Sequence, residues 1–182
     1  AMKFVSNKNL VNSLFEYTSI DQTANSPLAN ALFHFPYVKN VFFDKNYISI
    51  TKYELATWEE ITMELREFIR SHIEGGKKIV ELDSSDIITN SEEEKNKEFE
   101  KLDETSQEII NILEEYVKPA VAADGGNIQF KSYNPETKKV SVILQGACSG
   151  CPSSTFTLKN GIENMLKEML AGKVDSVEAI NG

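Results

Sequence analysis

The clearest pattern of hydrophobic and polar positions lies in the C-terminal half of the chain. Apolar residues recur every three or four positions in residues 109–121 and again in residues 158–170, which predicts two amphipathic helices. Apolar and polar residues alternate around Ile128 and again around Val142, which predicts two strands between the helices. A turn at residues 134–137 makes these two strands antiparallel.

Two further signals complete this half of the chain. The run Asp124-Gly125-Gly126 ends the first helix, because glycine readily adopts the left-handed conformation that closes a helix. Residues 174–180 predict a last strand. The expected order is helix, strand, strand, helix, strand, which makes a small two-layer domain with both helices on one face of a short sheet.

The N-terminal half predicts a second, mixed domain. Ser26 followed by Pro27 is typical of a helix start, and the run from Thr57 to Glu60 is a capping box before another helix. Between these helices, residues 41–43 and residues 47–50 predict two strands joined by a turn at residues 44–46. The residues that share one face of the second helix are Trp58, Ile61, Leu65, Phe68, Ile69 and His72.

Residues 86–102 interrupt both patterns. They carry six acidic and three basic side chains, and residues 90–98 contain no apolar side chain. Such a charged stretch is typical of a solvated linker. We therefore expect an α+β protein of two small domains, residues 1–85 and residues 103–182, joined by an acidic linker at residues 86–102.

Composition narrows the class of partner and the compartment. A net charge of −9 and a pI of about 4.8 argue against nucleic-acid or acidic-membrane binding, which both need basic patches. No stretch is apolar for the length of a membrane span, and no export signal is visible. Two cysteines in such a chain fit a reducing compartment. We expect the bacterial cytoplasm, with the mitochondrial matrix as the alternative if a transit peptide has been removed.

Cys148-Ser149-Gly150-Cys151 holds both cysteines of the 182-residue chain. The motif stands between a predicted strand and a predicted helix, and the small residues around it let a bulky ligand approach the sulfur atoms. The N-terminus of the following helix, which Ser153 or Ser154 can cap, carries partial positive charge and favours thiolate over thiol. We therefore expect Cys148 and Cys151 to form a pair of stabilised thiolates.

The spacing of the cysteines alone leaves a metal site, a redox site or neither open. A thioredoxin-like motif needs a strand–helix–strand context, usually with an aromatic residue before the first cysteine. Here two antiparallel strands precede the motif, and Ala147 precedes Cys148. A closed zinc site needs further cysteines or histidines, but His34 and His72 lie in the other predicted domain. We interpret both histidines as structural side chains.

Two thiolates are half of the ligand set that a tetrahedral zinc ion or a cubane iron–sulfur cluster takes from protein. Two chains supply four thiolates, so a site on the twofold axis of a homodimer would be complete. Such a site is exposed at an interface and easily lost. The half set therefore favours a carrier over an enzyme.

Longer runs of sequence around the motif resemble a known family. Asp124-Gly125-Gly126, the segment at residues 144–154 around the two cysteines, and Thr157-Leu158-Lys159-Asn160-Gly161-Ile162-Glu163 closely resemble the C-terminal domain of NifU, which the Nfu-type proteins share. This resemblance covers about residues 103–180.

The first half of the chain resembles the N-terminal domain that accompanies it in Nfu proteins. The similar segments are residues 26–29, 38–43 and 57–61. In that domain an Asn-Pro-Asn segment commonly precedes the strand that Met2-Lys3-Phe4 matches, so we expect an N-terminal piece to be trimmed or absent.

The resemblance implies a scaffold or carrier that is not an enzyme. It implies a labile 4Fe–4S cluster held by Cys148 and Cys151 of two subunits, and its transfer to apo iron–sulfur client proteins after supply by upstream assembly proteins. Asp124-Gly125-Gly126 is interpreted as structural, and the first domain as a recognition module. Two alternatives remain: a thiol–disulfide oxidoreductase with Cys148 as nucleophile and Cys151 as resolving thiol, or a zinc-bridged structural dimer.

Overall fold

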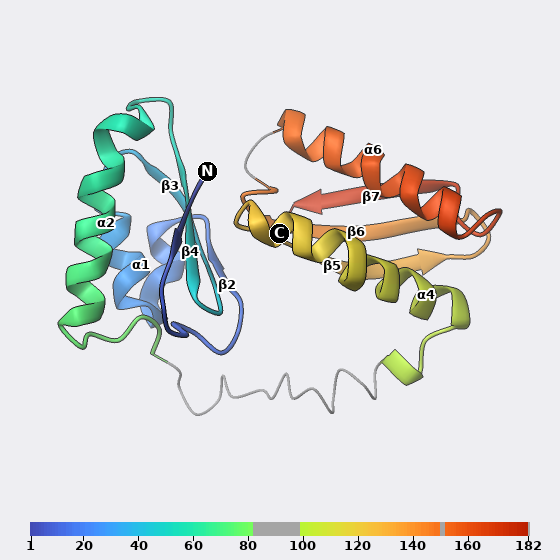
Figure 1. Cartoon of the computed structure of the whole chain (residues 1–182), viewed down its shortest axis with the longest axis horizontal. Helices are drawn as coiled ribbons and strands as arrows, with labels where there is room; N and C mark the ends of the chain where they lie inside the picture. The colour runs from blue at the N-terminus through green and yellow to red at the C-terminus, as the bar shows by residue number, and fades with distance from the viewer. Residues whose placement is uncertain (82–98, 150–151, 182) are drawn as a thin grey trace. The chain divides into compact units, whose positions relative to one another are not determined.

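The computed structural model describes residues 1–81, 99–149 and 152–181, with side chains in the last segment described from Thr155 onward. The chain forms two compact units, residues 1–88 and residues 89–182 (Figure 1). Each unit combines a sheet with helices, so the predicted α+β class is confirmed. The predicted linker at residues 86–102 lies mostly outside the described residues.

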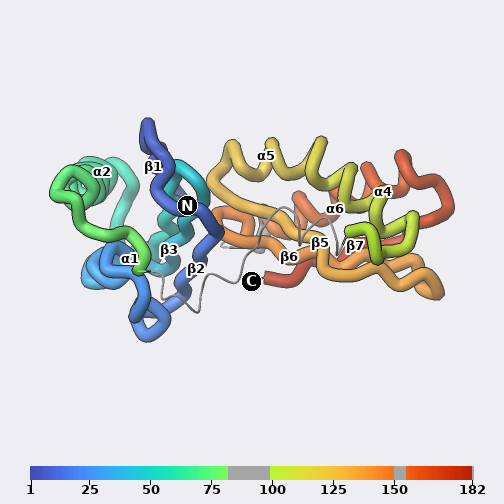
Figure 2. Tube along the Cα trace, turned by 90° about the horizontal axis from the view of Figure 1, so that it is seen from below, coloured from blue at the N-terminus to red at the C-terminus, as the bar shows by residue number. Residues whose placement is uncertain are grey.

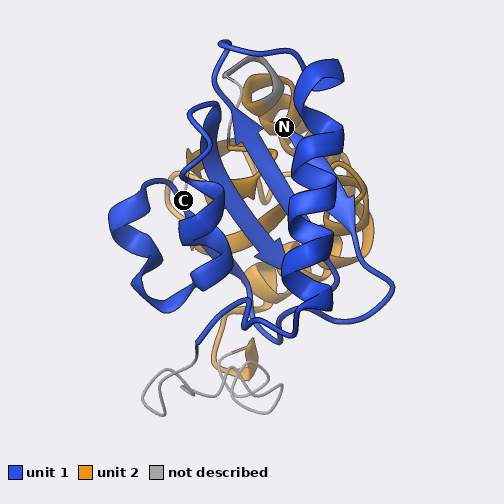
Figure 3. Cartoon of the chain, turned by 90° about the vertical axis from the view of Figure 1, so that its left-hand side faces the viewer, with its two compact units in different colours: residues 1–88 blue, residues 89–182 orange. Residues whose placement is uncertain are grey.

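Unit 1 is built on a four-stranded antiparallel sheet in the order β1-β4-β3-β2. The strands are β1 (Met2–Val5), β2 (Phe15–Tyr17), β3 (Val38–Asp44) and β4 (Tyr47–Lys52). The helical segments are η1 (Ile20–Asn25), α1 (Pro27–Leu32) and α2 (Trp58–Glu74). Figure 3 shows α1 and α2 on the same face of this sheet.

The local signals predicted for unit 1 are confirmed. Ser26 caps α1 by accepting a hydrogen bond from the Ala29 N–H at 3.1 Å, with Pro27 in the first helical turn. At the start of α2, the Thr57 N–H donates to the Glu60 carboxylate at 2.9 Å, as a capping box requires. The predicted hairpin is β3–β4 with a turn at Lys45, which has a φ of 47°. The hydrophobic pattern did not predict β1 and β2, which are only four and three residues long.

Unit 2 has a three-stranded sheet in the order β5-β6-β7. The pairing of β5 (Gly126–Asn134) with β6 (Lys139–Gly146) is antiparallel, and that of β6 with β7 (Ser176–Asn181) is parallel. The helical segments are α4 (Glu104–Ile112), η2 (Leu113–Val117), α5 (Lys118–Ala123) and α6 (Pro152–Met169). They cover one face of the sheet, as predicted (Figures 1 and 2).

The first helix of unit 2 runs through three segments because of Pro119. The middle segment η2 is π-helical, and the Lys118 N–H donates to the carbonyl oxygen of Leu113, five residues earlier. Proline has no N–H and its ring displaces the carbonyl four residues before it, so the helix widens at this point. The helix resumes as α5, which leads directly to Asp124 and the two glycines.

The core of unit 2 follows the alternation seen in the sequence. The three apolar residues of β6 that point toward the helices, Val140, Val142 and Leu144, are fully buried. Ser141 and Ile143, which alternate with them, lie on the other face of the sheet and are only partly buried. This packing holds the end of β6 in place against the helices. In the described part of the chain, no helix has the length and apolar character that crossing a membrane requires.

Candidate functional site

The first cysteine of the motif lies just beyond the end of β6, on the turn into α6. Because β6 and β7 are parallel and α6 connects them, this turn belongs to a strand–helix–strand unit. The sequence argument that the motif lacks a strand–helix–strand context is therefore wrong. Two antiparallel strands do precede the motif, but α6 and the parallel strand β7 follow it. Gly150 and Cys151 lie outside the described residues, as do the side chains of the predicted caps Ser153 and Ser154.

Hydrogen bonds between neighbouring residues hold the described part of the loop. Gly146 has a φ of 64°, a conformation that glycine adopts without strain. The Ser149 N–H and hydroxyl both donate to the Gly146 carbonyl oxygen, at 3.2 Å and 3.0 Å. The Thr155 hydroxyl donates to the Cys148 carbonyl oxygen at 2.8 Å and so ties the first turn of α6 back to the cysteine. The backbone that carries the Cys148 thiol is fixed on both sides.

The run Asp124-Gly125-Gly126 packs directly against this loop. Gly125 ends α5 with a φ of 83°, as predicted, and its carbonyl oxygen accepts a hydrogen bond from the Ala147 N–H at 3.3 Å. Gly126 lies opposite Gly146 at the start of β5. A Cβ atom on Gly126 would stand 2.3 Å from the Cys148 sulfur and 3.1 Å from the Cys148 backbone nitrogen. Gly126 therefore makes the space that the thiol occupies.

Sequence reasoning missed this role of Gly126. It expected either Gly125 or Gly126 to end the helix, which Gly125 does, and it assigned Gly126 no further role. No local pattern could show that Gly126 meets a residue twenty-two positions later, because the contact depends on the register of β5 against β6.

The surroundings of Cys148 do not favour the thiolate that the sequence predicted. The residue is 7% exposed, and burial together with the nearby Asp124 carboxylate raises the pKa of its thiol to about 11. The predicted stabilised thiolate is therefore wrong for Cys148 in this conformation, where the thiol is neutral.

A shallow depression of about 330 Å³ adjoins the loop. Phe156, on the first turns of α6, lines it and is 64% exposed. Lys159, one turn further along, also lines it. A large apolar side chain with so much exposed surface beside the cysteine loop gives this end of unit 2 an open, partly apolar surface.

The described residues contain no group of three or more potential metal-binding side chains. Both histidines have structural contacts in unit 1. His72 is 7% exposed and its Nε2 lies 3.1 Å from the Lys78 carbonyl oxygen, so its interpretation as a packed side chain is confirmed. The Nδ1 of His34 lies 2.8 Å from the Asn30 carbonyl oxygen. Within the described ranges, Cys148 is the only residue at the loop with a soft metal-binding atom.

Comparison with protein families agrees with this architecture. Residues 109–178 match the family described as NifU-like domain. Residues 1–76 match the family described as scaffold protein Nfu/NifU N terminal. The two matches fall on the two units, one on each.

Individual relatives match across both units. NifU-like protein 4, mitochondrial, of Arabidopsis thaliana is 34% identical over 167 residues, which are 90% of this chain and 56% of the relative. NFU1 iron-sulfur cluster scaffold homolog, mitochondrial, of Drosophila willistoni is 36% identical over 166 residues, 91% of this chain and 54% of the relative. A NifU-like protein of Schizosaccharomyces pombe is 30% identical over 163 residues, 87% and 59% respectively. The chain thus spans a little over half the length of these curated relatives.

Proposed function

The chain belongs to the Nfu family of NifU-like iron–sulfur cluster scaffold proteins, and we propose that it carries a labile 4Fe–4S cluster as cargo and delivers it to apo-proteins. Cys148 and Cys151 are its ligands, and two chains share one cluster. The protein is a binding protein and not a catalyst. One observation carries this proposal beyond family membership: the fold reserves a Cβ-free space at Gly126 for the sulfur of Cys148.

Half a ligand set per chain supports the shared site. A cubane cluster takes about four thiolates from protein, and each chain has two cysteines. A twofold axis through the cluster would bring four sulfur atoms together. The exposed Phe156 beside the loop supports an interface at this end of unit 2, because large apolar side chains are enriched where proteins meet.

The raised pKa of Cys148 supports a loosely held cluster. Ionising a thiol with a pKa of about 11 instead of the ordinary 9.0 costs about 3 kcal/mol more, and iron binding must supply this free energy. The same cost favours release, because a Cys148 thiolate displaced from iron takes up a proton as it returns to its buried position. In transfer, a client thiolate replaces one of the two cysteines on iron, and no general acid or base of this chain is required.

The partners and compartment follow as parts of the proposal. The receiving partners are apo iron–sulfur proteins, and upstream assembly proteins supply the cluster. The names of the relatives place those proteins in mitochondria. This favours the mitochondrial matrix, the alternative from the sequence, over the bacterial cytoplasm.

Anaerobic reconstitution with iron and sulfide tests the proposal. We expect about four iron and four sulfide ions for every two chains, with a broad absorption band from thiolate-to-iron charge transfer. Cys148→Ser and Cys151→Ser should each lose the band. Gly161→Ala lies within α6, the helix that follows the cysteine loop, and nothing is within 4 Å of its added Cβ; it is the matched control and should keep the band. A normal cluster in either cysteine variant would refute the ligand assignment.

The strand–helix–strand context keeps the oxidoreductase alternative open. Its test is turnover of a protein disulfide with excess dithiol and without iron. The burial and raised pKa of Cys148 predict no turnover, because thiol–disulfide exchange needs an accessible thiolate. For the zinc-bridged dimer, retention of zinc under conditions in which iron and sulfide fail to replace it would favour a structural metal.

A further inference from the structure

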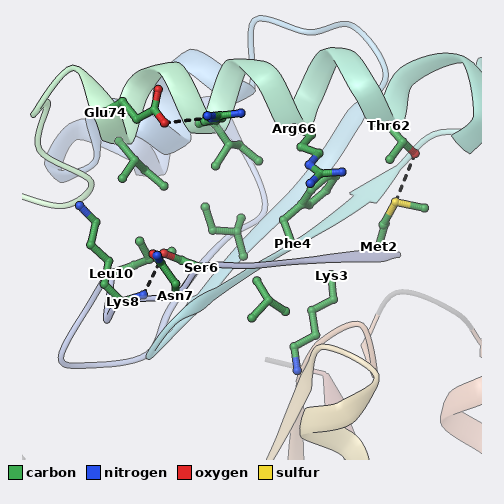
Figure 4. A pocket seen from close by; sticks show the side chains of 15 residues that line it. Met2, Lys3, Phe4, Ser6, Asn7, Lys8, Leu10, Thr62, Arg66 and Glu74 are labelled. Carbon is green, nitrogen blue, oxygen red and sulfur yellow. Dashed lines mark hydrogen bonds and ion pairs between the residues drawn. The ribbon is translucent and has the colours of Figure 1, made fainter.

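A wide groove of about 830 Å³ runs through unit 1 between α2 and β1 (Figure 4). All of its lining residues lie between Met2 and Glu74, so the groove belongs to unit 1 alone. None of them belongs to the cysteine loop. The following inference therefore goes beyond the proposed cluster chemistry and does not depend on it.

One face of α2 forms the upper wall of the groove. Thr62, Arg66, Ile69, Arg70 and Ile73 line it, and this spacing of three or four residues places their side chains along one side of the helix. The opposite wall is β1 and the segment that follows it. Phe4 and Leu10, which are partly buried, add apolar surface opposite α2. The groove thus has a mixed polar and apolar lining.

The charges at the rim of the groove have one predominant sign. Arg66 and Arg70, the two arginines of the chain, both line it, and Lys8 lies on the opposite wall. Arg70 is ion-paired with Glu74 at 2.8 Å, and Lys3 points away from the groove, with its ammonium 4.1 Å from the centre of the Tyr47 ring (Figure 4). Of the cations that line the groove, Arg66 and Lys8 therefore have no ion pair with a described residue.

We propose that this groove is a docking site for an acidic segment of a partner protein that also carries apolar side chains. The carboxylates of the segment would pair with Arg66 and Lys8 from opposite walls, and its apolar side chains would contact Phe4, Leu10 and Ile73. Charge complementarity carries the argument, since this basic groove lies on a chain with a net charge of −9.

The shape of the groove separates this occupant from others. Its volume is in the range of sites that hold several side chains or a large ligand, and it is too large for a single inorganic anion. A nucleic acid needs many phosphate contacts, whereas two unpaired cations face this groove. A flat anionic membrane surface would not reach the apolar residues between the two walls.

Fluorescence anisotropy of the full chain with a labelled short peptide of alternating glutamate and leucine tests the proposal. We expect saturable binding that weakens when sodium chloride rises from about 50 to about 300 mM, because salt screens exposed charges. The double variant Lys8→Glu/Arg66→Glu should bind about tenfold more weakly, as two exposed ion pairs become repulsive. Lys39→Glu/Lys77→Glu makes the same charge change at exposed lysines outside the groove and should bind normally.

Three outcomes would overturn the proposal. They are equal affinity of the two double variants, absence of saturable binding to the wild-type chain, and binding of a lysine–leucine peptide as tightly as the glutamate–leucine peptide. Vesicles of anionic phospholipid that bind in an Arg66-dependent way would assign the groove to a membrane instead. Self-association that Lys8→Glu/Arg66→Glu abolishes would assign it to a second copy. Normal cluster reconstitution in Lys8→Glu/Arg66→Glu would show that cluster binding at the cysteine site does not depend on the groove.

Discussion

Replacing Gly126 with alanine should push the added Cβ into the Cys148 side chain, which is its nearest neighbour. The added Cβ would lie 2.3 Å from the Cys148 sulfur and 3.1 Å from both the Cys148 nitrogen and the Gln145 carbonyl oxygen. Optimal contacts between carbon atoms are about 3.5–4.0 Å, and those with sulfur are no shorter, so the overlap is about 1.2 Å or more. The sulfur can turn aside, but the two backbone atoms can shift only slightly because β5–β6 pairing holds them.

The magnitude of the effect follows from two opposing terms. Overpacking of this kind costs about 1–3 kcal/mol. Gly126 does not have a positive φ, so the alanine also lowers the conformational entropy of the unfolded chain, which stabilises by about 0.4–1 kcal/mol. We therefore expect a net loss of about 1–2 kcal/mol in the free energy of unfolding of unit 2.

Urea unfolding in a double-mutant cycle with Cys148→Ala measures this contact. Without the sulfur atom the worst overlap disappears, so Gly126→Ala should lose most of its destabilising effect in the Cys148→Ala background. Trp58, the single tryptophan, lies in unit 1, and its fluorescence should report an unchanged transition there. Far-UV ellipticity follows the unfolding of both units, so a shift in its transition that Trp58 fluorescence does not show reports the change in the stability of unit 2.

Gly161→Ala is the matched control for this cycle. Its Cβ meets nothing within 4 Å inside α6, so it should stabilise the protein by about 1 kcal/mol, as expected for glycine to alanine in a helix. Equal destabilisation by Gly126→Ala with and without the Cys148 sulfur would refute the reasoning. Normal cluster binding by Gly126→Ala would likewise show that the space at Gly126 does not serve the thiol.

Three further predictions concern single groups. In the Cys151→Ser variant without iron, Cys148 should be alkylated about 100-fold more slowly at pH 8 than an ordinary thiol, because only the thiolate reacts. The alkylation rate should rise about tenfold per pH unit toward pH 11, and a plateau below pH 9 would contradict the raised pKa of Cys148. Ser26→Ala should destabilise unit 1 by about 1–2 kcal/mol in Trp58 fluorescence, since the buried hydroxyl caps α1 and donates to the Ile79 carbonyl oxygen at 2.6 Å. Lys167 and the Val177 N–H lower the pKa of Glu163, so the Glu163 carboxylate stabilises the fold above about pH 4.5 and loses this contribution on acidification. The urea midpoint of Glu163→Gln should therefore vary less with pH than that of the wild-type chain, and an equal pH dependence would rule the contribution out.

The raised pKa of Cys148 also has a consequence for stability at high pH. The folded state holds the proton of this thiol more tightly than the unfolded chain does. The stabilisation is therefore fully present below about pH 9 and is lost as the pH rises through about 11.

Sequence patterns alone predicted the elements whose physical causes are local. The alternation along β6, the cap at Ser26 and the helix stop at Gly125 all depend on residues a few positions apart, and the structure confirms each of them. Strands β1 and β2 were not predicted from the pattern, because three or four residues are too few to show alternation.

The features that decide the chemistry of the site come from contacts between distant residues. The parallel direction of β7 places the cysteine loop in a strand–helix–strand unit, although the nearby sequence shows only an antiparallel hairpin. The register of β5 against β6 brings Gly126 to the Cys148 sulfur. The groove on unit 1 likewise combines Lys8 with Arg66, which belong to different elements.

By itself, the sequence predicted two α+β domains, because periodicity is a property of neighbouring residues. Its resemblance to Nfu proteins then implied that Cys148 and Cys151 are the candidate ligands. Only the tertiary structure decided the state of the Cys148 thiol. The pKa of a side chain depends on everything that packs around it, and burial of Cys148 together with the Asp124 carboxylate raises the pKa of its thiol above the ordinary value.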